Sequence, residues 1–208
     1  MDHKPLDWDP GMATKKVRVA RVYSNIVSPP VVAAALGFSV AWVDWPFWQG
    51  LVWAAIYGVM TSLLPMGVVV YMLKKGYISD LHISNRRERH IPYLVGVICS
   101  VVAVAIVTRF GGSQLMRSLA VCNAIGLAAL GSINAGWQIS NHTASIMAAT
   151  IFLGLVFGTA VSFALLPLVG MTFMARWWLR RHTVAQLIAG MLVGAAPILV
   201  LANLGYIN

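Results

Sequence analysis

Two histidines and several arginines stand where polar connections meet apolar segments, and these residue types together could act on a phosphate group. His142 and His182 each directly precede an apolar run, where the free backbone N–H groups of a helix start favour anions. An arginine side chain presents a planar fork of donors that matches phosphate oxygens. Two histidines beside such an anion pocket suit nucleophilic attack on phosphorus and proton donation to the leaving oxygen. The sequence therefore indicates phosphoryl chemistry that requires no metal and no organic cofactor.

The groups that could do this chemistry lie in three polar connections, at 74–92, 134–142 and 175–183. In the third connection, five residues separate Arg176 from His182. Gln186 follows His182 by four positions, which on a helix places the two side chains on one face, one turn apart. This spacing is more specific than the presence of basic residues alone.

The stretch ARWWLRRHTVAQLIAG in the third connection resembles the third signature of the type 2 phosphatidic acid phosphatase (PAP2) superfamily, SRxxxxxHxxxD. The stretch ISNHTAS is similar to the second signature, PSGH, and keeps Ser140 and His142. The first signature, KxxxxxxRP, is matched poorly, although arginines crowd the loop before Pro92. The resemblance covers about residues 47–204 and implies a helical membrane protein with a PAP2-like core.

Carried over residue by residue, the resemblance implies catalytic roles for three side chains. His182 would be the nucleophile that forms a phosphohistidine, and His142 would protonate the departing alkoxide. Gln186 takes the place of the aspartate that orients the nucleophile, and its carbonyl can accept the ring N–H without adding negative charge. Dolichyldiphosphatase-like members resemble this chain in having HTxxQ. Ala175 replaces the signature serine and removes a hydroxyl donor.

The same resemblance implies a set of substrate-binding residues. Arg176 matches the phosphate-clamping arginine of the third signature. Arg86 or Arg89 would substitute for the basic pair of the first signature. Ser140 and Asn141, from the second signature, would complete the set.

The composition predicts that these connections join membrane helices. Of 208 residues, 59% are hydrophobic and 10% charged, whereas a soluble domain carries about 25% charged residues. Apolar runs occur at 26–43, 47–73, 93–108, 115–133, 143–175 and 183–204, and about 20 residues span the hydrocarbon layer. The run 143–175 fits two short helices broken near Gly158, Pro167 or Gly170, with one long helix as the alternative. We expect an all-α polytopic bundle of six to seven membrane-crossing helices.

Residues 1–24 are predicted to form a polar, basic arm before a transmembrane domain of residues 25–208. The arm and the three polar connections share one side of the membrane if the run 143–175 crosses it twice. That side then carries thirteen of the fifteen Lys and Arg residues, and the positive-inside rule assigns it to the cytoplasm. We expect a multi-pass protein of a bacterial-type plasma membrane with its N-terminus and site in the cytoplasm. Members of the superfamily more often act on the outer or lumenal face.

The placement of the acidic residues narrows the functions further. All six Asp and Glu residues lie in the first 88 positions, so the remainder lacks the paired carboxylates of a glycosidase and the Asp-rich ligands of Mg²⁺. No polar face is left to lie along a nucleic acid.

The leading hypothesis is an integral lipid-phosphate phosphatase whose substrate is a phosphatidate-type or polyprenyl (di)phosphate lipid. The alternative is a catalytically silent relative that serves as a subunit or scaffold beside other membrane proteins. A haem protein with His142 and His182 as axial ligands ranks third.

Overall fold

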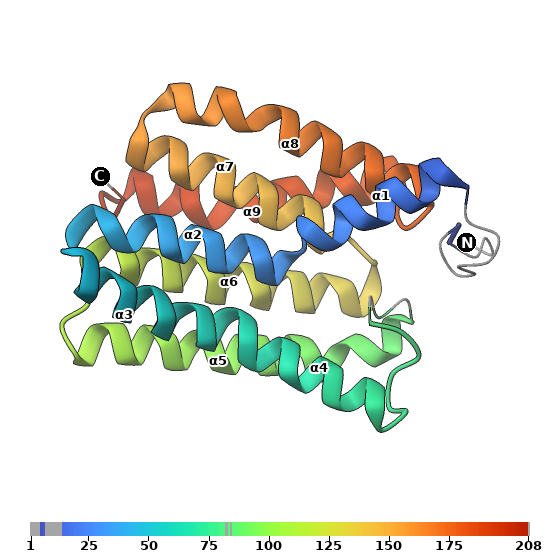
Figure 1. Ribbon diagram of the computed structural model, residues 1–208, viewed down its shortest axis with the longest axis horizontal. Coiled ribbons are helices and arrows are strands. Elements are labelled where there is room, and N and C mark those ends of the chain that lie inside the picture. Colours follow the sequence, from blue (N-terminus) through green and yellow to red (C-terminus); the bar gives the residue numbers. More distant parts are fainter. Residues whose placement is uncertain (1–4, 7–13, 82, 84, 208) are drawn as a thin grey trace.

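The computed structural model describes residues 5–6, 14–81, 83 and 85–207, with the backbone alone for Arg86 and Arg87. The regular elements within these residues are all helices, which confirms the predicted all-α class. They are α1 (Lys15–Ile26), α2 (Pro29–Asp44), α3 (Phe47–Gly58), a π-helical turn (Val59–Leu63), α4 (Leu64–Lys74), a 3-10 turn (Arg86–Arg89), α5 (His90–Arg109), α6 (Gln114–Gly136), α7 (Asn141–Phe157), α8 (Thr159–Trp178) and α9 (Val184–Asn203). Figure 1 shows these helices lying side by side in one bundle.

The helices form a multi-pass membrane protein. The pair α1 and α2 is apolar enough to cross a membrane as one segment bent by 42°, and α7 is a shorter apolar helix of 17 residues. A helix of that length extends roughly 26 Å, close to the ~30 Å of the hydrocarbon layer. With the bent pair counted as one span, the described residues contain six helical segments that could cross a membrane, the lower end of the predicted range, and α7 is shorter than these. The five longer candidate spans are Phe47–Lys74, His90–Arg109, Gln114–Gly136, Thr159–Trp178 and Val184–Asn203.

The predicted division of the run 143–175 into two helices occurs at Gly158. This residue adopts φ 100° and ψ 154°, a backbone conformation that glycine enters far more readily than other residues. The chain reverses there, so α8 returns along α7 (Figure 1). Pro167 and Gly170, the other predicted break points, lie inside α8.

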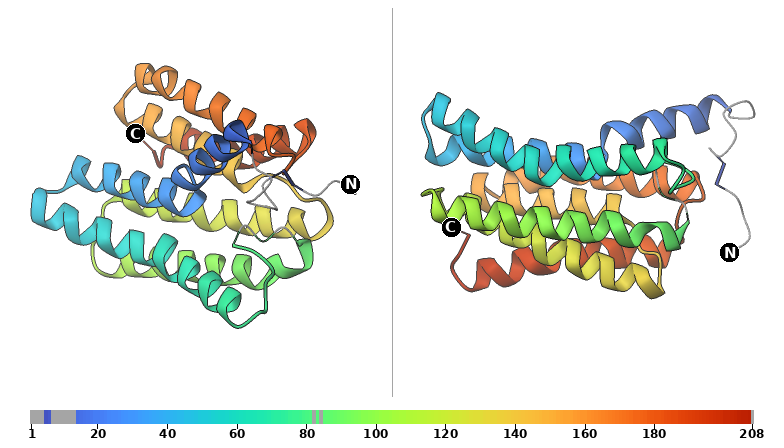
Figure 2. Two further views of the ribbon diagram at one scale, coloured as in Figure 1. Left: turned by 45° about the vertical axis from the view of Figure 1, so that its right-hand side comes forward. Right: turned by 90° about the horizontal axis from the view of Figure 1, so that it is seen from below.

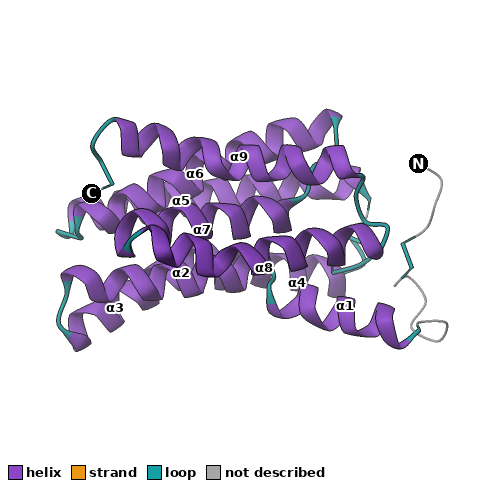
Figure 3. Cartoon of the chain, turned by 90° about the horizontal axis from the view of Figure 1, so that it is seen from above, coloured by secondary structure: helices purple, strands orange, loops and turns teal. Residues whose placement is uncertain are grey.

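Because α8 runs back along α7, the three polar connections meet at one end of the bundle. Figure 1 shows the loops after α4, α6 and α8 at the end where α1 begins, and the connections before α3, α6 and α8 at the other end. Figure 2 and Figure 3 show the same arrangement from other sides. We call the first the site end (loops 75–89, 137–140 and 179–183) and the second the turn end (connections 45–46, 110–113 and 158).

The main apolar core lies toward the turn end. It includes the fully buried side chains of Val40, Val107, Met116 and Phe152. Each of these residues stands in the half of its helix that is nearer the turn end. The site end is therefore left to hold polar groups.

Close contact between α7 and α9 fixes the second and third connections to each other. A Cβ atom on Gly190 would overlap the carbonyl oxygen of Ser140, and one on Gly194 would overlap that of Ala144. Small residues of this kind let membrane helices approach backbone to backbone. The starts of both helices are thereby held together at the site end.

Helix α1 lies against α8 at the site end. The hydroxyl group of Thr14 caps its start by accepting the N–H of Val17 over 3.4 Å. Near its other end, the Tyr23 hydroxyl donates to the carbonyl oxygen of Leu168 in α8 over 3.0 Å. The helix continues through the predicted boundary between arm and domain at residues 24–25, so this part of the arm is packed on the bundle.

Candidate functional site

Two hydrogen bonds join the loop before α7 to the first turn of α9. The N–H of Ser140 donates to the carbonyl oxygen of Gln186 over 3.2 Å. The hydroxyl of Thr143 donates to the carbonyl oxygen of Leu187 over 2.9 Å. These bonds bring the segments that resemble the second and third signatures into direct contact.

His182 is buried at the site end, with 6% of its surface exposed. Its Nδ1 lies 3.2 Å from the carbonyl oxygen of Gln138. A carbonyl can only accept, so we assign the proton to Nδ1, which leaves Nε2 as the nitrogen with the lone pair. Burial lowers the pKa of His182 well below 6.5, and the positive charges of Arg176 and Arg89 lower it further. The ring is therefore neutral near pH 7, the state that a nucleophile requires.

Gln186 does not contact His182 through a hydrogen bond between their side chains in the described structure; it forms a capping box with Thr183. The side-chain oxygen of Gln186 accepts the N–H of Thr183 over 2.9 Å, and the Thr183 hydroxyl accepts the N–H of Gln186 over 3.3 Å. Both bonds satisfy donors at the start of α9. The role of orienting the His182 ring, which the sequence analysis gave to Gln186, is taken by the backbone of Gln138.

Arg176 stands in the last turn of α8 and is 3% exposed. Ionisable side chains within membrane helices are expensive and usually mark a functional site. Arg176 lines the same cavity as His182 and helps to lower the pKa of that histidine. Ala175 beside it is buried, so a methyl group occupies the place where the third signature has a serine.

Of the two arginines predicted from the first connection, Arg89 can be placed at the site, whereas the side chain of Arg86 lies outside the described residues. Its Nε donates to the carbonyl oxygen of Ile83 over 2.7 Å, and its Nη1 donates to the side-chain oxygen of Asn134 over 3.4 Å. The amide nitrogen of Asn134 donates in turn to the Tyr93 hydroxyl over 3.1 Å. This network holds Arg89 between α5 and α6.

Sequence reasoning missed Asn134, Tyr93 and Gln138. Asn134 carried a signal, since it is an amide in the last turn of a predominantly apolar helix, and the structure buries it to 2% exposure. Tyr93 stands in the first turn of α5, and its hydroxyl could have been predicted as a hydrogen-bond partner of Asn134. Gln138 acts through its main chain, on which the side-chain type gives no information.

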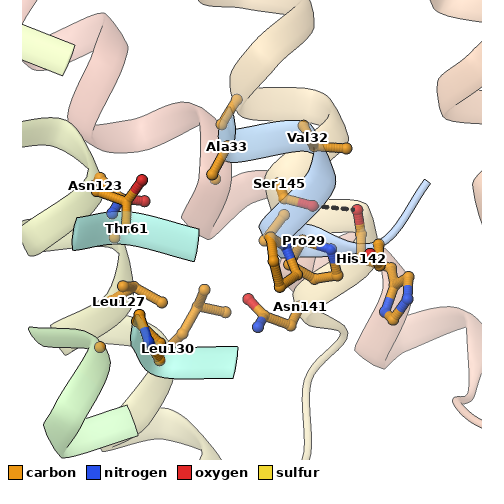
Figure 4. Close-up of a pocket in the computed structure, with 18 of the residues that line it drawn as sticks. Pro29, Val32, Ala33, Thr61, Asn123, Leu127, Leu130, Asn141, His142 and Ser145 are labelled. Carbon is orange, nitrogen blue, oxygen red and sulfur yellow. Dashed lines mark hydrogen bonds between the residues drawn. The ribbon is translucent and has the colours of Figure 1, made fainter. Parts of the chain in front are cut away.

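His142 is the second residue of α7 and is 9% exposed. Its Nε2 lies 3.2 Å from the carbonyl oxygen of Ser24 in α1, so a neutral ring carries its proton on Nε2. Asn141 and His142 both line the cavity. Figure 4 shows their side chains diverging from adjacent positions on α7. The contact with α1 had no counterpart in the sequence motifs.

Ser140, a predicted substrate contact, caps the start of α7. Its side chain is fully buried, and its hydroxyl accepts the N–H of Thr143 over 3.4 Å as the N-cap of α7. Serine is among the preferred residues at this position because its oxygen satisfies one of the free N–H groups. The hydroxyl therefore organises the helix start, while the neighbouring Asn141 lines the cavity.

A cavity of about 500 Å³ collects the candidate groups. The side chains of Arg89, Arg176 and His182 line it, as do those of Asn141 and His142. Much of its remaining wall is apolar and comes from α2, α4, α5 and α6; Figure 4 labels Val32, Ala33, Leu127 and Leu130 among these residues. The arrangement can hold an anion at one end and a hydrocarbon body at the other.

No protein family, curated protein or solved structure matches the chain. Within the described part of the chain, no three or more His, Cys, Asp or Glu side chains are grouped so that they could hold a metal ion.

Proposed function

We propose that the protein is an integral membrane phosphatase that hydrolyses the phosphate monoester or diphosphate of a lipid through a phosphohistidine. The observation that carries the proposal is the burial of Arg176 and His182 along a cavity whose other walls are largely apolar. Removing a cation from water costs several kcal/mol, which an anionic ligand would offset. A lipid phosphate supplies that anion together with a tail suited to the apolar walls.

In the first step, the Nε2 lone pair of neutral His182 attacks phosphorus while the bond from phosphorus to the lipid oxygen breaks. The ring gains a positive charge, and its Nδ1–H remains bonded to the Gln138 carbonyl. A carbonyl dipole stabilises this charge less than the carboxylate of the family signature would. Arg176 and Arg89 would hold the oxygens of the transferring group, where negative charge accumulates.

In the second step, the lipid alkoxide takes a proton, and water then hydrolyses the phosphohistidine to release phosphate and restore neutral His182. His142, in its imidazolium form, is the proton donor that the motif resemblance implies, and it becomes neutral as the alkoxide takes the proton. Its Nε2 lies 3.2 Å from the carbonyl oxygen of Ser24. We therefore expect the ring to release this carbonyl and to donate its Nε2 proton to the leaving oxygen instead. The same ring would then accept a proton from the attacking water.

The covalent intermediate gives the direct test. Purified protein is mixed with a lipid phosphate labelled with ³²P and quenched in alkali, in which phosphohistidine survives. We expect label on His182 in the wild type, none in His182→Asn, and normal labelling in the matched control His90→Asn, because His90 is exposed at the start of α5. Labelling of the His182→Asn protein would contradict the proposed nucleophile.

A catalytically silent scaffold is the second candidate. Gln186 and Ser140 favour this candidate, because both stand at positions of the signatures but their side chains cap the starts of helices. Absence of both turnover and label with phosphatidate, diacylglycerol diphosphate and polyprenyl diphosphate, together with co-purification of partner subunits, would support it.

We also propose that the site end faces the cytoplasm. Lys15, Lys16, Lys74 and Lys75 all lie at this end, where the positive-inside rule expects them. Single cysteines at Tyr77 and Phe110, both exposed in loops at opposite ends, test this in a protein whose native cysteines are replaced. We expect an impermeant thiol reagent added outside intact cells to label Phe110→Cys and not Tyr77→Cys; the reverse pattern would place the site end outside.

A further inference from the structure

The cavity continues from the cationic side chains into the apolar interior of the bundle. Leu36, Tyr57 and Ile198 line its deeper part. Along α6 its lining extends from Leu130 to Leu119, a length of roughly 16 Å at 1.5 Å per residue. The lining along α6 is therefore about half as long as the ~30 Å hydrocarbon layer is thick.

The polar side chains within this deeper part are bonded to the protein. The Asn123 amide nitrogen donates to the Ser100 hydroxyl over 2.9 Å, and the Thr61 hydroxyl donates to the carbonyl oxygen of Tyr57 over 2.9 Å. Figure 4 shows Thr61 and Asn123 on the side of the pocket away from His142. With these donors engaged, the deep part of the cavity favours an apolar ligand.

The size of the cavity limits the number of chains it can take. A volume of about 500 Å³ lies in the middle of the range of roughly 300–1,000 Å³ over which protein pockets hold a single drug-sized ligand. One hydrocarbon chain fits beside a phosphate group in such a volume, whereas the two chains of a diacyl lipid exceed it.

We propose that this cavity encloses the tail of a lipid phosphate with a single hydrocarbon chain, whose phosphate lies against Arg89, Arg176 and His182. The inference rests on the proposed function and narrows its substrate class. A two-chain lipid would have to leave at least one chain outside the bundle.

Gly126 offers a position at which a larger side chain can reduce the space for the tail. It stands on α6 in the wall of the cavity, and a Cβ atom added to it meets nothing within 4 Å. The Cβ atom of a leucine there has room, so we expect its side chain to occupy part of the cavity. Gly170 provides the matched control, because it is equally unobstructed but exposed on α8.

The test measures the binding of radiolabelled lipids to full-length protein in a His182→Asn background, which prevents turnover. We expect Gly126→Leu to weaken the binding of farnesyl phosphate at least about tenfold, since each displaced methylene weakens binding several-fold. Gly170→Leu should bind farnesyl phosphate like the parent protein. Should Gly126→Leu not fold, Ala148→Leu on the α7 wall provides the same obstruction.

Three ligands distinguish the lipid classes. Farnesyl phosphate and lysophosphatidate each carry one chain, and we expect both to bind more tightly than dioleoyl phosphatidate; the tighter of the two identifies the tail as isoprenoid or acyl. Binding of phosphatidate as tight as that of the one-chain lipids, or unchanged farnesyl phosphate binding in Gly126→Leu, would overturn the tail site. If the proposed function is wrong, the result is different. The wild type then does not turn over these lipids, although the lipids still bind in the expected order.

Discussion

The site end and the turn end are built from the same helices but differ in how they place charge. At the site end Arg176 and His182 are buried, whereas at the turn end Arg109 and Arg117 are exposed. An exposed arginine keeps its hydration, and a buried one loses it at a cost of several kcal/mol. The comparison indicates that a candidate binding site is recognised by whether its basic residues are buried. The number of basic residues at one end bears instead on how the protein is oriented in the membrane.

The largest effect is expected from removal of the proposed nucleophile at the site end. His182→Asn should lower the turnover of a lipid phosphate by at least about 10³-fold, because the covalent route is lost. His90→Asn changes an exposed histidine and should retain the wild-type rate. Steady-state rates in detergent micelles measure both. A His182→Asn rate within tenfold of the wild type would refute covalent catalysis.

The arginines of the two ends give the next largest effect. Arg176→Lys keeps the charge but loses the planar fork, and we expect a fall of about 10²-fold in kcat/KM. Arg109→Lys makes the same change at the exposed turn end and should leave kcat/KM unchanged. If both substitutions lowered kcat/KM equally, the proposed difference between the site end and the turn end would be wrong.

A smaller effect is expected at Gln186, since its side chain caps α9. Gln186→Ala should lower the free energy of unfolding by about 0.5–1 kcal/mol and reduce the rate by no more than about threefold. Thermal unfolding and steady-state kinetics of the same preparation measure the two quantities. A loss of about 100-fold in rate with unchanged stability would restore the orienting role that the motif resemblance implies.

The smallest effect concerns pH. His182 must be neutral to attack, and burial together with nearby arginines holds its pKa well below 6.5. The acid-side fall of kcat/KM should therefore lie below pH 6.5. Arg181 is one of the charges that lower this pKa, so Arg181→Gln should move the fall to higher pH by a fraction of a unit. The second pKa of the substrate, near 6 for a phosphate monoester, is common to both proteins; identical profiles would argue against His182 as the titrating group.

Much of the fold was predictable because it depends on patterns that the sequence carries directly. The apolar runs gave the helices, and the run 143–175 was too long for one crossing, which pointed to a break that the structure places at Gly158. Counting crossings then predicted that the three polar connections share one end, as Figure 1 shows. Each of these steps uses residue type and spacing alone.

The site was predictable only in part. Arg176, His142 and His182 line one cavity as the motifs suggested, because the reversal between α7 and α8 brings the connections that carry them to the same end of the bundle. The contacts of the rings were not predictable. They go to the carbonyl oxygens of Ser24 and Gln138, whose positions follow from how separate helices pack.

The bond between His182 and the main chain of Gln138 makes one determinant of reactivity invisible to scanning mutagenesis. Every genetically encoded replacement at position 138 still presents a carbonyl group, so an alanine scan does not test this bond. Chemical synthesis offers access: an ester in place of the amide between residues 138 and 139 weakens this acceptor and leaves the side chains intact.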